Sequence, residues 1–478
     1  MARAGGKPSP HHISPDIALG SADIQRSLRF NKADDHYLTR TPSSTGNQKI
    51  WTFSAWIKRT NLTNNYHYIY SAHSGSDYFA LYFENDNLHS YFSPGNNYGV
   101  ISDREFRDSN SWLHLVHQVD ATNTVQKIWI NGEELSLNSG RNPGNSNYPM
   151  NESGVAMIVG NASWWLDERA SDMYLAEVNY IDGSLIAPTE FAFTEPQTGI
   201  WMPKRYEGVY GSNGFYLDFS DNSSTTTLGI DKSPNGNDFT ANNFSVSAGA
   251  GNDSLEDTPT NNFCTLNPLD SNSGINFSQG NLVVNTSGGF DLAKSTFYLT
   301  SGKWYWEVTC DDTGNGFIGV SDQDDVLNNR GGGNATSCTI RSTNGDKRIS
   351  GSTSSYGSAI ADGDVMMFAV DKDSNKFWAG KNGTWFNSGD PAAGSNEATS
   401  ALTNPVSPSV SLYDNEDYTF NFGQRAFSYT PPTGFKTIES RNLPLTTPSI
   451  VRPQRHFDNI IYDGDGSASK DITGLQFK

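Results

Sequence analysis

Apolar and polar residues alternate with a period of two along most of the chain. In IWTFSAWIKRT, the side chains of Trp51, Phe53, Ala55 and Ile57 fall on one face of such a segment. The same alternation recurs in YFALYFEN, SWLHLVHQVD, VQKIWINGEEL and MYLAEVNYIDGSLI. This is the period of a strand with one buried face, so residues 27–195 are predicted to form an antiparallel β-domain.

A second block of strands covers residues 265–436 and includes GKWYWEVTC, GFIGVSD, VMMFAVD, KFWAGKNG and DYTFNFG. Asn and Gly tolerate the positive φ of a type I′ hairpin, so two turns are predicted, one at Asn131 and Gly132 and one at Asn382 and Gly383. The predicted fold class is all-β, with two antiparallel β-sandwich domains of the jelly-roll kind in tandem.

Three segments lack this alternation. Residues 1–26 contain prolines and histidines without periodicity and predict an extended N-terminal arm. Residues 196–264 are rich in turn-forming residues, with one clear strand, and predict a connector that is ordered in places by packing on its neighbours. Residues 437–478 predict a linker followed by the first strands of a further β-unit. Whether the chain continues beyond Lys478 stays open.

The net charge of the chain limits the classes of partner that it is expected to bind. It carries 33 Lys+Arg against 52 Asp+Glu, a formal net charge of −19, so binding to nucleic acid or to an anionic membrane is not expected. No apolar stretch is long enough to predict membrane insertion, and the first residues lack the apolar segment of a secretory signal. Three cysteines without a CxxC spacing predict neither a disulfide framework nor a structural zinc site.

The strand segments carry the signatures of two known families. WTFSAWIKR, SWLHLVHQVD, IWINGEEL, VGN and LAEVNYIDG, within residues 27–195, resemble a laminin-G-like, concanavalin-A-like domain. GKWYWEV, GFIGVSD, GDVMMFAVDKDSNKFWAGKNGTWFNSGDP and YTFNFGQRAFSYTPPTGF, within residues 265–436, resemble a SPRY domain. Both resemblances imply two-sheet β-sandwiches used for recognition, of glycans or proteins by the first and of protein partners by the second.

The segment between the two blocks, which includes GIWMPKRYEGVYGSNGFYLDFSDNSS, resembles the one that joins these folds in structural proteins of marine bacteriophages. This resemblance implies a non-enzymatic virion protein, a tail fibre or related appendage for host attachment, made in the host cytoplasm. The implied partners are other virion proteins through the N-terminal arm, a host surface glycan or protein, and further copies of the chain. A capsid decoration protein or head fibre is the alternative within this class. A glycan depolymerase and a bacterial surface adhesin are the alternatives from other classes.

Some enzymes with the concanavalin-A-like fold are glycosidases, which need two carboxylates close together. Their E-x-D-x-x-E pattern is absent, and the nearest acidic cluster is WLDERASDM. Its adjacent Asp167 and Glu168 would point to opposite faces of a strand, so we interpret the cluster as a solvated loop. The chain is therefore expected not to be an enzyme.

The laminin-G-like resemblance also implies a calcium ion held by Asp side chains and backbone oxygens. Asp77, Asp86 and Asp167 are the candidate donors, and the sequence offers no basis for choosing among them. No other cofactor is expected.

Two further loops are candidate contact surfaces. Trp164 and Trp165 lie in GNASWWLDERASD, a predicted loop, and exposed aromatic side chains stack on sugar rings. This pair is the candidate glycan-binding platform, although one ring could equally cap the edge of the sandwich. The glycine-rich NNRGGGNATSC, which begins at Asn328, is predicted to be a flexible loop of the second sandwich.

Overall fold

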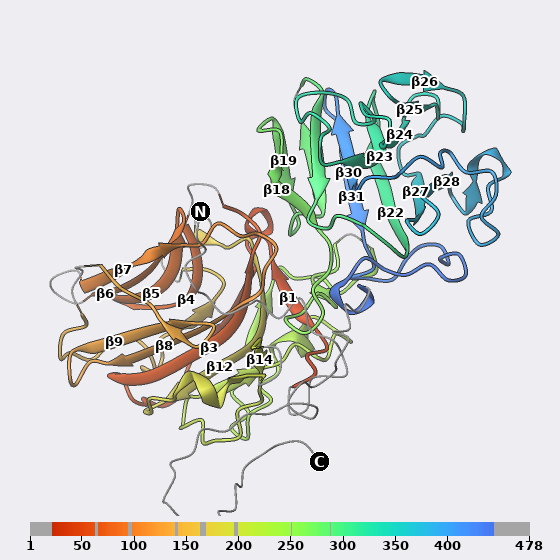
Figure 1. Cartoon of the computed structure of the whole chain (residues 1–478). Helices are drawn as coiled ribbons and strands as arrows, with labels where there is room; N and C mark the ends of the chain where they lie inside the picture. The colour runs from red at the N-terminus through yellow and green to blue at the C-terminus, as the bar shows by residue number, and fades with distance from the viewer. Residues whose placement is uncertain are drawn as a thin grey trace, which may run out of the picture.

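The computed structural model describes residues 22–62, 66–93, 98–138, 142–162, 169–195, 199–249, 251–286 and 288–443. Within these residues the chain forms two antiparallel β-sandwiches that lie side by side (Figure 1). The predicted all-β fold class is therefore confirmed. Among the described residues, no helix is long and apolar enough to cross a membrane.

The first sandwich consists of two sheets. One sheet has the strand order β10 (Glu133–Glu134), β9 (Val125–Ile130), β8 (Leu113–Asp120), β3 (Ile50–Arg59), β12 (Met173–Asp182), β1 (Ser27–Phe30) and β17 (Ser254–Leu255), and β15 (Phe215–Leu217) also pairs with β12. The other has the order β16 (Thr240–Asn242), β2 (Tyr37–Arg40), β11 (Met157–Val159), β4 (Tyr66–Ser74), β5 (Asp77–Glu84), β6 (Asn87–Ser93) and β7 (Tyr98–Glu105). The hairpin β13 (Ala192–Thr194) and β14 (Trp201–Pro203) and the 3₁₀ turns η3 (Lys32–Asp34), η4 (Pro188–Glu190) and η5 (Thr226–Gly229) complete this half.

The core of the first sandwich is aromatic. The indole of Trp51, on β3, meets Phe79 of β5 edge to face, with ring centroids 5.4 Å apart. The ring of Phe53 stacks on Tyr70 of β4 at 4.1 Å. These contacts join the two sheets and follow from the period-two pattern, which turns alternate residues of each strand into the same layer.

The outer face of β3, β8 and β12 is also buried, which the alternation did not predict. On β8, His117 points into the core, where its Nδ1 lies 2.8 Å from Tyr70 Oη. His114, three residues earlier, points outward, and its Nδ1 accepts a hydrogen bond from Trp201 Nε1 at 3.1 Å. Burial lowers the pKa of His114 to about 3 and that of His117 to about 4, so both rings are neutral. The covering segment is the chain that follows residue 186.

Residues 196–264 do more than connect the two domains. Three strands of the first sandwich come from this segment: β15 pairs with β12, β16 with β2, and β17 with β1. The expected end of the first domain at residue 195 is therefore too early. The sequence predicted only the strand that contains β15. β16 and β17 have three and two residues, too few for alternation to be recognised, and their pairing partners lie far away along the chain.

The boundary of the N-terminal arm at residue 26 also differs from the structure. Ile24 is 3% exposed and belongs to a core cluster that includes Trp201. The backbone N–H of Ala22 donates to the carbonyl of Pro203 at 3.0 Å. Residues 22–26 are thus part of the folded body, and residues 1–21 lie outside the described residues.

The second sandwich also has two sheets. One has the order β18 (Leu266–Ser271), β21 (Asp291–Ser295), β30 (Val406–Leu412), β23 (Phe317–Asp322), β24 (Cys338–Arg341), β25 (Lys347–Ile349) and β26 (Ser352–Ser354). The other has the order β19 (Ile275–Ser278), β20 (Val283–Thr286), β31 (Asp417–Asn421), β22 (Lys303–Asp312), β27 (Val365–Asp371), β28 (Lys376–Lys381) and β29 (Thr384–Trp385). The 3₁₀ turns η6 (Phe386–Ser388) and η7 (Ser440–Asn442) follow. The three cysteines are buried and unpaired.

Both predicted hairpin turns have the backbone conformation that their residues favour. Asn382 and Gly383, between β28 and β29, have φ of 50° and 82°. Asn131 and Gly132, between β9 and β10, have φ of 51° and 77°. Positive φ at both central positions is the requirement of a type I′ turn.

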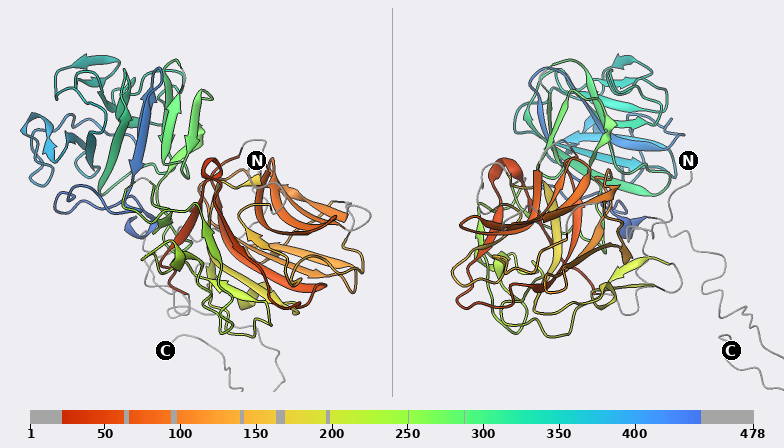
Figure 2. Two further views of the ribbon diagram at one scale, coloured as in Figure 1. Left: turned by 180° about the vertical axis from the view of Figure 1, so that it is seen from behind. Right: turned by 90° about the vertical axis from the view of Figure 1, so that its left-hand side faces the viewer.

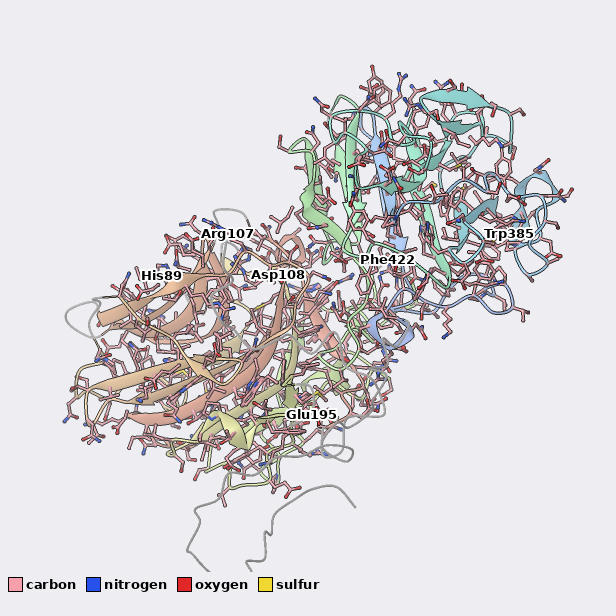
Figure 3. All side chains as sticks on the ribbon, in the orientation of Figure 1. His89, Arg107, Asp108, Glu195, Trp385 and Phe422 are labelled. Atoms are coloured by element: carbon pink, nitrogen blue, oxygen red, sulfur yellow. The ribbon has the colours of Figure 1, made fainter. Side chains whose placement is uncertain are left out.

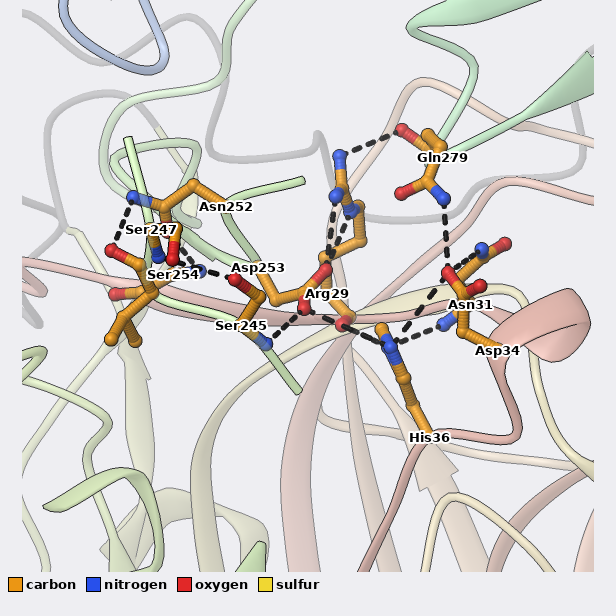
Figure 4. Close-up of polar contacts among 12 residues, drawn as sticks. Arg29, Asn31, Asp34, His36, Ser245, Ser247, Asn252, Asp253, Ser254 and Gln279 are labelled. Atoms are coloured by element: carbon orange, nitrogen blue, oxygen red, sulfur yellow. Dashed lines mark hydrogen bonds and ion pairs between the residues drawn. The ribbon is translucent and has the colours of Figure 1, made fainter. Parts of the chain in front are cut away.

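The two sandwiches share a buried polar junction, which Figure 4 shows in part. The Arg29 guanidinium, on β1, lies 2.9 Å from the Asp253 carboxylate. Arg29 Nη1 also donates to the carbonyl of Gln279 in the second sandwich at 3.1 Å, and Gln279 donates back to Asp34 at 3.0 Å. Tyr174 Oη donates to the carbonyl of Gly280 at 2.9 Å. These bonds fix the β19–β20 turn against the first sandwich.

An apolar cluster continues across the same junction. It runs from the core of the second sandwich through Cys264 and Leu255 to Trp56 and Trp112 of the first sandwich. Figure 2 shows from two further sides that the sandwiches meet at one end of each. A continuous core of this kind opposes independent rotation of the two domains.

Candidate functional site

The outward face of β4, β5 and β6 carries a cluster of tyrosines. This sheet forms the upper layer of the first sandwich in Figure 1. On β5, Phe79, Leu81 and Phe83 are fully buried in the core. Because strand residues alternate between faces, Tyr78 and Tyr82 point to the opposite side of the sheet. We call the residues on that side the tyrosine face: Tyr66, Tyr68, Tyr78, Ala80, Tyr82, His89 and Tyr91.

The register of the strands pairs these rings. Tyr68 lies opposite Tyr82, and the two rings stack with centroids 4.7 Å apart and planes 10° apart. The rings of Tyr78 and Tyr91 form a second stack, at 5.2 Å and 7°. Ala80 lies between the two stacks on β5, directly opposite Tyr91 on β6. Its methyl group leaves a hollow where a larger side chain would fill the space.

The hollow is a pocket of about 300 Å³. It is lined by Tyr66, Tyr68, His73, Ser76, Tyr78, Ala80, Tyr82, Tyr91 and Arg169. The guanidinium of Arg169 lies 3.7 Å from the ring centroid of Tyr66, so it covers one wall of the pocket. Among the described residues, no Asp or Glu lines the pocket, although the chain as a whole is strongly acidic.

Burial sets the protonation of the tyrosine face. It raises the pKa of Tyr68, Tyr78 and Tyr82, so these phenols keep their protons throughout the physiological range. A protonated phenol can both donate and accept a hydrogen bond. His89, labelled in Figure 3, stacks on Tyr82 at 5.1 Å, and burial lowers its pKa. Tyr68 and Tyr82 are buried, whereas Tyr66, Tyr78 and Tyr91 are half-buried, so the pocket presents the exposed parts of these three rings beside neutral hydroxyl groups.

The tyrosines that line the pocket lie within residues 66–91, whereas the predicted glycan-binding platform is Trp164 and Trp165. Trp164, Trp165 and Asp167 lie outside the described residues, immediately before Arg169 in the chain. The tyrosine face was not singled out from the sequence, although its signal is present. In YHYIYSAHS and DYFALYFE, tyrosines take the positions that alternate with the apolar core residues.

The calcium candidates do not converge. Asp77 and Asp86 flank opposite ends of β5, which are roughly 23 Å apart at about 3.3 Å per residue. The Asp86 carboxylate forms an ion pair with Arg107. Among the described residues, no group of three or more His, Cys, Asp or Glu side chains could hold a metal ion. Asp77 and Asp86 therefore do not fit one calcium site.

The acidic cluster around Asp172 has structural contacts. The Asp172 carboxylate accepts hydrogen bonds from the backbone of Lys32 at 2.8 Å and from the side chain of Asn61 at 2.9 Å. These bonds hold η3 and the end of β3 together. Asp167 and Glu168 lie outside the described residues.

The second sandwich carries a different surface near the loop that begins at Asn328. Arg330 lies over Phe290, with 3.9 Å from its guanidinium carbon to the ring centroid, and Phe290 stacks on Tyr413 at 4.3 Å. Three arginines surround the ring of Phe317 at 5.7 to 6.0 Å: Arg330, Arg341 and Arg348. Within the described part of the chain, none of the three forms an ion pair with a carboxylate. We call this group the arginine–aromatic surface.

Comparison with known families agrees with this division. Residues 31–188 match the family described as the concanavalin A-like lectin/glucanases superfamily, and residues 303–425 match the SPRY domain. A comparison with curated protein sequences finds no significant match.

Three solved structures are similar in fold. The SPRY domain of human HERC1 is 17% identical, with a TM-score of 0.29, over 34% of this chain and 99% of that one. A heptameric SAP-like pentraxin from Limulus polyphemus is 15% identical, with a TM-score of 0.28, over 35% of this chain and 80% of that one. A Bacteroides ovatus protein described as a candidate carbohydrate binding protein is 19% identical, with a TM-score of 0.33, over 46% of this chain and 59% of that one.

With identities below 20% and TM-scores of 0.33 or less, these likenesses say nothing of what this chain binds. Each family match lies within one of the two sandwiches, and both kinds of domain are consistent with a binding function. The chain therefore has two sandwiches in tandem, of which the first contains the match to the concanavalin A-like family and the second the match to the SPRY domain.

Proposed function

We propose that the chain is a non-enzymatic recognition protein whose first sandwich binds a glycan in the tyrosine pocket. The observation that carries this proposal is the pair of tyrosine stacks on either side of Ala80. Aromatic rings on an outward face bind the apolar faces of sugar rings, and neighbouring hydroxyls meet the sugar hydroxyls.

The shape of the site favours a small ring over a flat protein surface. A hollow of about 300 Å³ is at the lower end of the range for small-ligand pockets. His73 and Ser76 place polar groups at its rim beside the phenols. A few polar groups around an apolar floor are what orient a sugar that stacks on aromatic rings.

The described residues that line the pocket offer no carboxylate pair, which supports binding without hydrolysis. A glycosidase needs two carboxyl groups about 5–10 Å apart on either side of the bond to be cleaved. The described residues that line the pocket include neither Asp nor Glu. A depolymerase would have to use a different site, and release of reducing ends from a bound polysaccharide would reveal it.

The biological setting that we propose is a phage virion, with the chain in a tail fibre or related appendage that attaches to the host. The resemblance of the connecting segment to marine phage structural proteins supports this setting. In it, residues 1–21 would contact another virion protein, and further copies of the chain would complete the appendage. A position on the capsid, as a decoration protein or head fibre, is the alternative that a map of the intact particle would distinguish.

The arginine–aromatic surface favours a second, protein contact. Arginine and aromatic residues are enriched where proteins bind one another. Of the three arginines around Phe317, Arg330 is exposed and Arg341 half-buried, and neither forms an ion pair with a carboxylate among the described residues. We propose that this surface of the second sandwich binds an acidic region of a protein partner.

A glycan array probed with the full chain tests the main proposal. The double variant Tyr78→Ala/Tyr91→Ala removes one stack, and we expect at least a tenfold loss of affinity for any bound glycan, because stacking contributes about 1–2 kcal/mol. Tyr413→Ala, on the second sandwich, is the matched control and should bind as the unchanged chain does. Equal binding by the double variant, at an unchanged melting temperature, would refute the tyrosine pocket as the glycan site.

A further inference from the structure

Building on the proposed glycan function, we propose that the ligand of the tyrosine pocket is an acidic saccharide, whose carboxylate is bound by Arg169. Two observations lead to this ligand class. One is the position of the Arg169 guanidinium, 3.7 Å from the Tyr66 ring centroid and on the wall of the pocket. The other is the sign of the charge around the hollow.

The first observation excludes a cationic ligand. A cluster of tyrosine faces could in general form an aromatic cage for a quaternary ammonium group. Here a cation of the chain itself already lies over Tyr66. A second cation in the same hollow would be repelled by the guanidinium, which does not lose its proton in proteins. The pocket therefore takes a neutral or an anionic ligand.

The second observation favours the anionic one. The formal charge of the whole chain is −19, yet the pocket is lined by an arginine and a histidine and, among the described residues, by no acid. Two carboxylates lie close by without lining the pocket: Asp77, which accepts a hydrogen bond from Ser76 Oγ at 3.3 Å, and Glu84, which lies 3.7 Å from His89 Nδ1. The one fixed charge among the described residues that line the hollow is that of Arg169, and this positive charge attracts an anion.

The geometry also suits a carboxylate. The contact with the Tyr66 ring restrains the guanidinium, so less side-chain freedom is lost when a ligand binds. A guanidinium has five N–H donors, so it can hold contacts within the chain and still meet a carboxylate with two of them. A uronic or sialic acid combines such a carboxylate with a sugar ring that can stack on tyrosine.

The test compares matched sugars that differ only in charge. The probes are trigalacturonic acid, trimannuronic acid and 3′-sialyllactose, each beside its neutral methyl ester, titrated into the full chain by calorimetry. For at least one pair we expect the acid to bind about tenfold more tightly than its ester, and we expect this ratio to fall as salt screens the charges. Arg169→Gln should bring the ratio close to one and leave the affinity for the ester within about twofold. Arg107→Gln, on the same sandwich, is the control and should keep the ratio.

The outcomes separate this inference from the function on which it rests. Binding of acid and ester with equal affinity, or tighter binding of the ester, would overturn the acidic ligand and leave glycan binding intact. An unchanged ratio in Arg169→Gln would also overturn the role of that residue. If no member of any pair binds and the glycan array is also blank, the glycan function itself fails. The melting temperature of each variant is measured to show that a change in affinity does not come from loss of folding.

Discussion

Lys58 Nζ lies 2.8 Å from the carboxylate of Asp257, and both side chains are buried, with exposed fractions of 0% and 1%. The ammonium also donates to Asn262 at 2.8 Å, and Trp112 Nε1 donates to the other Asp257 oxygen at 2.9 Å. Lys58 belongs to β3 of the first sandwich, whereas Asp257 and Asn262 belong to the segment that leads into the second. This pair therefore holds the segment that joins the two sandwiches.

Loss of the lysine should be costly because it leaves a buried, unpaired carboxylate. We expect Lys58→Met to lower the free energy of unfolding by about 3–5 kcal/mol, measured by urea denaturation of the full chain. Lys127→Met removes an ion pair with Glu134 of similar length, 3.0 Å, whose side chains are 45% and 50% exposed. That control should change stability by less than about 1 kcal/mol. Equal effects of the two variants would show that the Lys58 pair is not buried as described.

The turn between β28 and β29 should depend on Gly383. Its φ of +82° is strained for a residue with a side chain, and a Cβ there would lie 3.2 Å from the ring of Tyr429. Gly383→Val is expected to destabilise the second sandwich by about 1–3 kcal/mol. Gly251→Val is the matched control, because φ at Gly251 lies outside the positive range and no atom lies within 4 Å of its would-be Cβ. A melting midpoint that is unchanged in Gly383→Val would contradict the turn.

The buried His114 should make stability depend on pH. Burial lowers its pKa from 6.5 to about 3, so the unfolded chain binds a proton in this interval that the folded chain does not. The contribution of neutral His114 to the free energy of unfolding is fully present above pH 6.5. It decreases as the pH drops toward 3, by up to about 1.4 kcal/mol per pH unit. The advantage of the unchanged chain over His114→Gln should therefore shrink by about 2 kcal/mol between pH 7 and 5. The measurement is urea unfolding of both chains. An equal difference in their free energies of unfolding at pH 7 and at pH 5 would refute the burial of a neutral His114.

The N-terminal boundary makes a prediction about truncation. A chain that begins at Ser27 loses Ile24, which is 3% exposed, and should lose about 1.5–3 kcal/mol of stability. A chain that begins at Ala22 keeps that contact and should melt at the temperature of the full chain. If residues 1–21 dock on a virion protein, as we propose, both truncated chains should fail to join particles. Normal incorporation of the chain that begins at Ala22 would show that attachment lies elsewhere.

Limited proteolysis should distinguish a flexible connector from a structural one. Residues 220–262 lie between the sandwiches in sequence, and from sequence alone they would be an early site of cleavage. In the structure they contain β16 and β17, and Asp253 and Asp257 pair with buried cations. We therefore expect residues 251–262 to resist cleavage for as long as the two sandwiches stay folded. Early cleavage beside Asp257 would contradict the buried junction.

Local patterns in the sequence determined the class and number of the domains. The alternation around Trp51 and Phe53 predicts strands, because one face of each strand must be buried while the other is not. The turns at Gly132 and Gly383 are also predicted by local sequence, because only a few residue types favour positive φ, whatever the rest of the fold. Local signals of this kind are therefore enough to predict the two sandwiches.

Tertiary structure alone decided the sites, because they depend on strand register and on distant segments. Tyr68 meets Tyr82 only because β4 and β5 pair in one register, and a slip of one residue would turn the tyrosines into the core. Arg169 reaches Tyr66 across more than a hundred residues of chain, and Lys58 reaches Asp257 across 199. Such contacts leave no periodic signal in the sequence, since each partner is one polar residue among many. Only the folded chain shows which of them converge.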